Sequence, residues 1–216
     1  MTTSSSSSSL AEVLALHNAA VSENQTSRLQ RYCEQLWDWN TRLNLTRHTD
    51  FDSFVTRDLL DSRQLAEQLS DDERVLDAGS GGGVPGIILA ILNPALNVSL
   101  SESTRKKAAA LQAIVDSLDL PVTVFAERAE DVLRNQSFDT ITARAVAPLK
   151  KLLPWFRPQR RQFQRLLLIK GPSWATERDA AADGGAMRDV DLQILHEYAT
   201  AGRDGHSVVM EVRFTG

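Results

Sequence analysis

The chain has 216 residues, of which 42% are hydrophobic and 24% are charged, a composition that fits one folded domain with a modest extension. The formal net charge of −4 at pH 7 argues against a polyanionic partner unless positive charge gathers locally. No apolar run is long enough to cross a membrane, no signal segment opens the chain and the four histidines lack metal-ligand spacing, so we expect a cytoplasmic protein without a bound metal.

The N-terminal third is expected to be helical. Residues 1–9 are almost purely Ser and Thr and predict a disordered tail, because they have no apolar surface to bury. Residues 10–70 predict a helical cap, since apolar residues recur at helical spacing over 10–21, from 29 to 43 and from 51 to about 69. Ser27 is the expected N-cap of the middle helix.

From Arg74 onward, strands and helices alternate. Short apolar strands are expected at residues 74–77, 97–102, 122–126, 138–143 and 166–169, with Pro85 and Thr104 opening two of the helices between them. The end of the chain predicts two further strands, 192–198 and 206–214, joined by a turn around 202–205. Residues 71–216 are therefore expected to form one Rossmann-like domain with a mainly parallel sheet, helices on both faces and a hairpin at one edge.

The strongest chemical signal is a glycine-rich loop, residues 77–86, between the first strand and the next helix. Such a loop brings backbone N–H groups close to a bound nucleotide. The segment from Gly81 to Gly86 also matches the dinucleotide pattern G-x-G-x-x-G, so the loop alone does not choose between cofactors.

Two of three features favour S-adenosylmethionine as the cofactor, and the other fits a dinucleotide equally well. Asp77 places a carboxylate at the strand tip, beside Gly79 and Gly81, where it suits an ammonium and a sulfonium and repels a pyrophosphate. Glu102 ends the second strand and can accept hydrogen bonds from ribose hydroxyls, which both cofactors carry. The chain also leaves little room for the substrate domain that most dehydrogenases have. The alternative is a tight turn that binds nothing.

A stretch without Asp or Glu, residues 140–176, points to the methyl acceptor. Aromatic residues are interleaved with its eight cations, which are Arg144, Lys150, Lys151, Arg157, Arg160, Arg161, Arg165 and Lys170. A local basic patch with aromatics is typical of proteins that bind an anionic partner such as a nucleic acid. The alternative is a solvated face with the aromatics in the core.

Motifs that are absent from the sequence disfavour some classes of methyl acceptor. Residues 142–148 lack the Asn- or Asp-Pro-Pro-aromatic segment common in amine methylation, and the only cysteine, Cys33, lies far from the glycine loop and is expected to be a buried apolar residue. A ring nitrogen such as guanine N7 needs neither that segment nor a thiol nucleophile, since it already has a lone pair. Catalysis then consists mainly of positioning.

Six short motifs occur in a fixed order along the chain, and together they resemble one family. They are Asn44-Leu45-Thr46, Arg57-Asp58-Leu59-Leu60-Asp61-Ser62, Asp77 to Gly86, Arg128-Ala129-Glu130, Ala143-Arg144-Ala145 and Ile169-Lys170-Gly171. The family is the bacterial ribosomal RNA small subunit methyltransferase G family, also called glucose-inhibited division protein B. The resemblance covers roughly residues 36–212.

The resemblance implies a class I S-adenosylmethionine-dependent methyltransferase fold with a mostly parallel seven-stranded sheet. It also implies transfer of a methyl group to N7 of a guanine in 16S rRNA, at the position numbered 527. The partner is then naked 16S rRNA or the small ribosomal subunit, and we expect the chain to act as a monomer. Two alternatives are a methyltransferase for a protein or small molecule and an RNA-binding module without catalysis.

The resemblance assigns roles to individual residues. By the family pattern Arg144, Lys170, Asp61 and Arg57 form the catalytic pocket. The residues that line the cofactor are Gly79, Val84, Ala129, Glu130 and Arg144, beside Asp77, Gly81 and Glu102 of the loop and second strand.

The sequence departs from the family at two positions. Asp58 stands where a His is usual, and Gly205 stands where an Arg commonly precedes the last strand's His. Each change removes a basic residue, so we expect an effect on substrate affinity more than on the fold. The basic loop with Arg157, Arg160 and Arg161 is a candidate compensation.

Overall fold

The computed structural model describes residues 8–199 and 205–216, and its centre is a seven-stranded sheet of order β3-β2-β1-β4-β5-β7-β6. The strands are β1 (Arg74–Ala78), β2 (Asn97–Ser101), β3 (Thr123–Phe125), β4 (Thr140–Arg144), β5 (Arg165–Lys170), β6 (Val190–Ala199) and β7 (His206–Phe214). Strands β1 to β5 are parallel, and β7 pairs antiparallel with both β5 and β6. This confirms the mostly parallel sheet with an edge hairpin. Most of the predicted tail (1–9) and most of the predicted turn (202–205) lie outside the described residues.

Both faces of the sheet are buried, because successive strand residues point to opposite sides. Val75 and Leu167 belong to one hydrophobic cluster, whereas their neighbours Leu76 and Leu168 belong to a second. The central strands read as near-continuous apolar runs for this reason, as is usual for parallel strands covered by helices.

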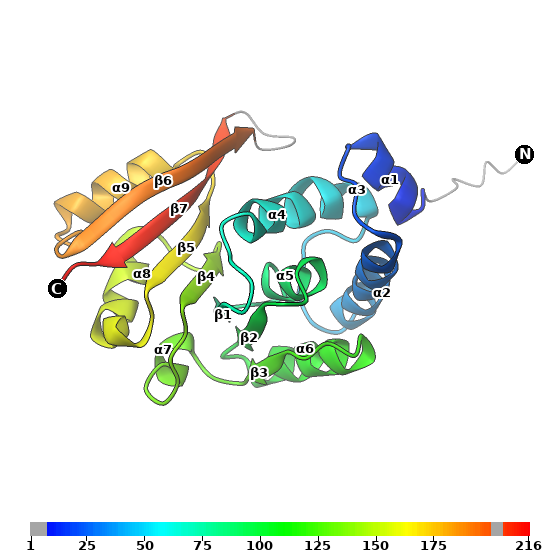
Figure 1. The fold of residues 1–216 in the computed structure, drawn as a ribbon, viewed down its shortest axis with the longest axis horizontal. Helices are drawn as coiled ribbons and strands as arrows, with labels where there is room; N and C mark the ends of the chain where they lie inside the picture. Colours follow the sequence, from blue (N-terminus) through cyan, green and yellow to red (C-terminus); the bar gives the residue numbers. More distant parts are fainter. Residues whose placement is uncertain (1–7, 200–204) are drawn as a thin grey trace, which may run out of the picture.

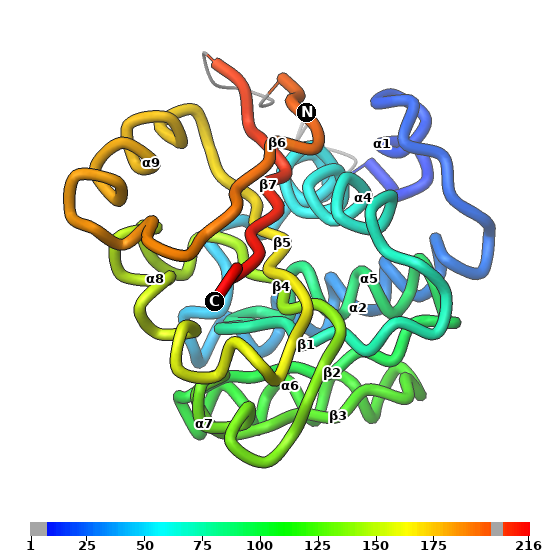
Figure 2. Tube along the Cα trace, turned by 60° about the vertical axis from the view of Figure 1, so that its left-hand side comes forward, coloured from blue at the N-terminus to red at the C-terminus, as the bar shows by residue number. Residues whose placement is uncertain are grey.

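Helices cover the two faces in separate sets (Figures 1 and 2). One face carries α1 (Leu10–Leu16), α2 (Glu23–Asn40), α3 (Phe51–Ser53), the π-helical segment η1 (Phe54–Leu59), α4 (Leu60–Ala66), α5 (Gly86–Leu92) and α6 (Arg105–Ser117). The other face carries α7 (Ala129–Val132), α8 (Leu149–Phe156), the 3-10 segment η2 (Arg157–Gln162) and α9 (Trp174–Asp183).

The N-terminal third is helical within the described residues, as predicted, but Ser27 is not the N-cap of α2. Ser22 caps α2 by a capping box with Gln25, and Ser27 lies inside the helix. The prediction was wrong because the first turn of α2 is polar and adds nothing to the apolar periodicity. The predicted helix from residue 10 also ends early, at Leu16.

The N-terminal helices share one hydrophobic cluster with α5, α6 and the sheet. Polar contacts join them as well: Gln25 Nε2 donates to the Leu92 carbonyl at 2.8 Å, and Tyr32 Oη donates to the Gly82 carbonyl at 2.8 Å. Cys33 is buried here, as predicted, and burial raises the pKa of its thiol. The division into a helical cap (10–70) and a Rossmann-like domain (71–216) stays a prediction.

At the amino edge of the parallel strands, Arg165 is held by two carboxylates. Its guanidinium lies 3.0 Å from Glu73 Oε1 and 3.0 Å from Glu211 Oε2, and the three side chains are largely buried. We call this group the Arg165 triad. It ties the starts of β1 and β5 to the end of β7, and loss of the Arg165 guanidinium would leave two largely buried carboxylates without this cation. Arg165 is therefore a structural cation, although it belongs to the acid-free stretch in sequence.

Candidate active site

A cavity of about 830 Å³ opens at the carboxyl edge of the parallel strands. Its walls come from the glycine loop, the loop after β4, the end of β5, the segments 44–48 and 56–61, and the end of β6. Ligands of open α/β sheets bind outside the carboxyl ends of the strands, so this is the expected place for a site.

The glycine loop is shaped by positions that only glycine fills without strain. Gly79 has a φ of +68°, and a Cβ there would lie 3.0 Å from Val146 Cγ2 across the cavity wall. A Cβ on Gly86 would lie 2.9 Å from Asp77 Cβ, so the start of α5 approaches β1 too closely for any other residue. Gly79, Gly81 and Val84 all line the cavity, and their contact with a cofactor stays a prediction.

Asp77 lies beneath the loop and is almost fully buried. Its Oδ2 accepts the Gly86 N–H at 3.2 Å, and its Oδ1 accepts the Thr142 hydroxyl at 3.3 Å. Burial raises the pKa of the Asp77 carboxyl to about 6, against the opposing effect of these hydrogen bonds. Asp77 does not border the cavity in the described structure, so its contact with a cofactor stays a prediction.

Glu102 lies beside the glycine loop, at the tip of β2. Its Oε2 accepts the Gly81 N–H at 3.2 Å, and its Oε1 accepts the Thr104 N–H at 2.7 Å. Each carboxylate oxygen keeps a further lone pair for a ribose hydroxyl. Ala129 and Glu130 start α7, away from the residues that line the cavity, and Glu130 lies 3.6 Å from Arg128. The structure does not bring these two into the cavity.

Arg144 ends β4 and is held by two carboxylates that line the cavity with it. Its Nη2 lies 2.7 Å from Asp58 Oδ1, and its Nη1 lies 3.1 Å from Asp61 Oδ2 and 3.4 Å from the Arg57 carbonyl. We call Arg144, Asp58 and Asp61 the Arg144 triad. Burial lowers the pKa of Arg144, but the two carboxylates more than offset it, so the net change is upward. Asp58, noted only as a departure from the family pattern, is thus part of the site.

Tyr198, near the end of β6, is a site residue that the sequence did not indicate. Its Oη donates to Asp61 Oδ1 at 2.8 Å, and its side chain lines the cavity. Burial raises the pKa of the Tyr198 phenol, and the Asp61 carboxylate raises it further. Burial likewise raises the pKa of Asp61, although Arg144 and Tyr198 oppose this. No sequence signal marks Tyr198, because its contact depends on the β6–β7 register.

Lys170, at the end of β5, reaches the same cavity but is already paired. Its Nζ donates to the Ala147 carbonyl at 2.8 Å and to Glu177 Oε2 at 2.9 Å, and the side chain is buried. Lys170 therefore holds the loop after β4 against α9. One of its three N–H donors remains for a ligand.

Three other cations border the cavity: Arg47, Arg57 and Lys107. Within residues 8–199 and 205–216, their side chains make no hydrogen bond or ion pair. We call these three the rim cations. Positive charge that is free to meet a ligand thus borders the cavity.

The acid-free stretch does not form one basic patch. Arg157 donates to the Ala186 carbonyl at 2.7 Å, and Arg160 donates to the Gly216 carbonyl at 2.5 Å, both from η2 at the amino edge of the sheet. Arg144 and Lys170 lie at the carboxyl edge. The prediction of one local basic patch was wrong because α8 carries the chain from one edge of the sheet to the other. The Arg157 loop therefore lies too far from the cavity to compensate for the basic residues missing at Asp58 and Gly205.

Gly205 lies where the backbone of this chain leaves little room for a side chain. Its φ is +100°, and a Cβ there would lie 2.8 Å from Pro172 Cβ. An arginine at this position would require the two segments to separate.

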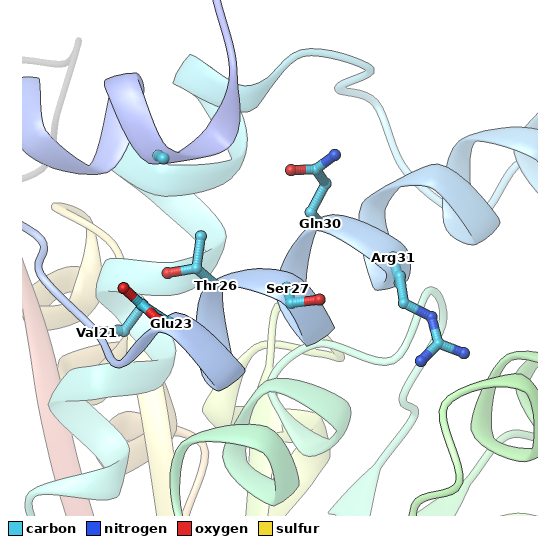
Figure 3. A pocket seen from close by; sticks show the side chains of 7 residues that line it. Val21, Glu23, Thr26, Ser27, Gln30 and Arg31 are labelled. Carbon is cyan, nitrogen blue, oxygen red and sulfur yellow. The ribbon is translucent and has the colours of Figure 1, made fainter.

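A second, smaller cavity of about 390 Å³ lies between α1 and α2 (Figure 3). The labelled side chains come from α2 and the residues just before it, and Gln30 and Arg31 point away from each other. It borders neither the glycine loop nor a strand end. Among the described residues, no helix is long and apolar enough to span a membrane, and no group of three or more His, Cys, Asp or Glu side chains is placed to hold a metal ion.

Comparison with known proteins gives one consistent family. The family model described as rRNA small subunit methyltransferase G matches residues 25–204. A ribosomal RNA small subunit methyltransferase G from Rhodopirellula baltica is 49% identical over 170 residues, covering 79% of this chain and 74% of that protein. A protein of the same name from Roseiflexus sp. (strain RS-1) is 41% identical over 180 residues, covering 78% and 77%.

Solved structures give the fold. An O-methyltransferase from Bacillus cereus, in complex with SAH, superposes with a TM-score of 0.61 at 15% identity and covers 94% of this chain and 97% of that chain. The chain therefore has the class I S-adenosylmethionine-dependent methyltransferase fold, as predicted.

The buried carboxylate of Asp77 predicts a distinct pH dependence of stability. Its folded pKa is raised from 3.8 to about 6, so the folded protein binds this proton more tightly than the unfolded chain. As the pH rises through the interval between these two pKa values, ionisation of Asp77 lowers the free energy of unfolding by roughly 3 kcal/mol. Asp77→Asn lacks this titration and should gain about that much stability relative to the wild type across this interval.

Urea unfolding of both proteins across this pH range measures the difference. Asp119→Asn, at an exposed position where asparagine tolerates the positive φ, is the control and should show no such gain. Parallel stability curves for the wild type and Asp77→Asn would contradict the assignment.

Proposed function

The chain belongs to the rRNA small subunit methyltransferase G family, and on that premise we propose that it methylates N7 of the guanine numbered 527 in 16S rRNA. S-adenosylmethionine is the methyl donor. The observation that carries the proposal is a cavity of about 830 Å³ that is lined by the glycine loop, the Arg144 triad and the rim cations together. We propose that the chain acts as a monomer in the cytoplasm.

The glycine loop and the strand tips beside it fit the methyl donor. Loop residues with positive φ let a ligand approach the backbone, and Glu102 keeps lone pairs for ribose hydroxyls. S-adenosylmethionine supplies an electrophilic methyl group when bound. The proposed donor-binding residues are Asp77, Gly79, Gly81, Val84, Glu102, Ala129, Glu130 and Arg144.

The part of the cavity around Arg144 fits a guanine base, and we propose Arg144, Lys170, Asp61 and Arg57 as the catalytic residues. Lysine and arginine N–H groups can donate to guanine O6, and Lys170 keeps one donor for this. N7 attacks with its own lone pair, so these residues need to position the base and no general base is required.

The rim cations suit the RNA backbone. Phosphate contacts account for much of the affinity of a protein for nucleic acid, and they need charges that are not already paired. Arg47, Arg57 and Lys107 meet this requirement, whereas Arg144 and Lys170 are held by carboxylates.

Methyl transfer onto rRNA tests the proposal directly. The full chain is incubated with tritiated S-adenosylmethionine and 30S subunits, 16S rRNA or total protein, and the labelled nucleoside is identified by mass spectrometry. We expect label in 16S rRNA as 7-methylguanosine, from subunits, naked rRNA or both. Label in protein alone would support the alternative acceptor, and cofactor binding without transfer would support a non-catalytic RNA-binding module.

The rim cations predict a charge-specific effect on RNA affinity. Arg47→Ala and Lys107→Ala should each weaken binding of a 16S rRNA fragment about 3- to 10-fold and lower the salt dependence by roughly one phosphate contact. Arg161→Ala, an exposed cation of η2 at the other edge of the sheet, is the matched control and should change neither quantity. A loss with Arg161→Ala and none with the rim variants would place the RNA on the η2 side instead.

A further inference from the structure

The Arg144 triad carries more negative than positive charge. One guanidinium faces two carboxylates, at 2.7 Å and 3.1 Å, so the formal charge of the three side chains is −1. Asp58 is 5% exposed, and solvent therefore screens the group only weakly. The group around Arg144, which the sequence predicts to be basic, is thus acidic in sum, although other cations border the same cavity.

The hydrogen bonds of the triad leave a carboxylate oxygen of Asp58 without a donor. Asp61 Oδ2 accepts from Arg144 and Asp61 Oδ1 accepts from Tyr198, which fixes this carboxylate. Arg144 Nη1 and Nη2 are engaged by Asp58, Asp61 and the Arg57 carbonyl. Asp58 Oδ2 accepts no hydrogen bond from the part of the chain that the structure describes. A negatively charged triad with an open carboxylate oxygen suits a cation better than a phosphate.

The chemistry of the proposed function supplies that cation. Methyl transfer forms a bond between N7 and the methyl carbon and breaks the bond between that carbon and sulfur, which keeps the electron pair. No proton is released, and the positive charge passes from the sulfonium to the purine ring. The side of the cavity that holds the base therefore becomes more positive as the reaction proceeds.

We propose that the Arg144 triad stabilises this developing charge on guanine, with Asp58 supplying the surplus negative charge and Tyr198 holding Asp61 in place. The inference rests on the proposed function and assigns Asp58 and Tyr198 roles in it. Fixed charges aimed at the place where charge develops accelerate a reaction because they need no reorganisation. An unpaired Arg144 would instead oppose the forming cation.

The proposal predicts opposite effects of Asp58→Asn on rate and on RNA affinity. The single-turnover rate of methyl transfer to 16S rRNA should fall about 10- to 100-fold, because the triad becomes neutral. The Kd for the rRNA should stay the same or decrease, since a charge that repels phosphate is removed. The Kd for S-adenosylhomocysteine, measured by calorimetry, should be unchanged.

The Arg165 triad offers a matched control. Glu211→Gln removes one carboxylate from a guanidinium that is also held by two, at the opposite edge of the sheet. The folded variant should transfer methyl groups within about twofold of the wild-type rate, because the lost charge lies at the edge of the sheet opposite the active site and is screened there.

The outcomes separate the two levels of the proposal. If the wild-type chain methylates rRNA, two results would overturn the role of the triad and leave the proposed function intact. One is a wild-type rate for Asp58→Asn, and the other is a parallel loss of the rate and of the affinities for rRNA and S-adenosylhomocysteine. Absence of label from rRNA with the wild-type chain overturns the proposed function and the triad's role together. If Asp58→Asn does not fold, Asp61→Asn removes the same charge and is judged by the same criteria.

Discussion

One buried carboxylate determines where the glycine loop leaves the sheet. Asp77 accepts hydrogen bonds from the Gly86 N–H at the start of α5 and from the Thr142 hydroxyl of β4. The group is desolvated, which costs free energy, and the two hydrogen bonds offset part of that cost. The loop, the first turn of α5 and the tip of β4 are thereby fixed relative to one another. Arg144 is the last residue of β4, so the same contacts also position Arg144.

Two arginines, each between two carboxylates, show how the same chemistry acquires different roles. Arg165 joins three strands at the amino edge and does not line the large cavity, so its charges serve the fold. Arg144 borders the large cavity at the carboxyl edge, where surplus negative charge faces a ligand. Burial and location, rather than residue type, separate a structural cation from a functional one. A count of basic residues along the sequence therefore does not locate the RNA-binding surface.

Local patterns predicted most of the fold, and contacts between distant segments explain what they missed. The strand tips at Asp77 and Glu102 follow from short apolar runs, because each run is complete within a few residues. The partnership of Asp58 with Arg144 spans 86 residues, and that of Tyr198 with Asp61 spans 137. The first contact needs the π-helical segment η1, which leaves no periodic signal. The second depends on the register of β6 with β7, which the predicted hairpin did not specify.

Hydrogen–deuterium exchange of the full chain, with and without S-adenosylhomocysteine, tests most directly that the carboxyl-edge cavity holds the methyl donor. Ligand binding should slow amide exchange in the glycine loop at 79–84 and in the loop after β4 at 144–148, both of which line that cavity. The α1–α2 cavity around Thr26 and Gln30 should exchange as before. Protection confined to the α1–α2 cavity, or none at the glycine loop, would contradict the assignment.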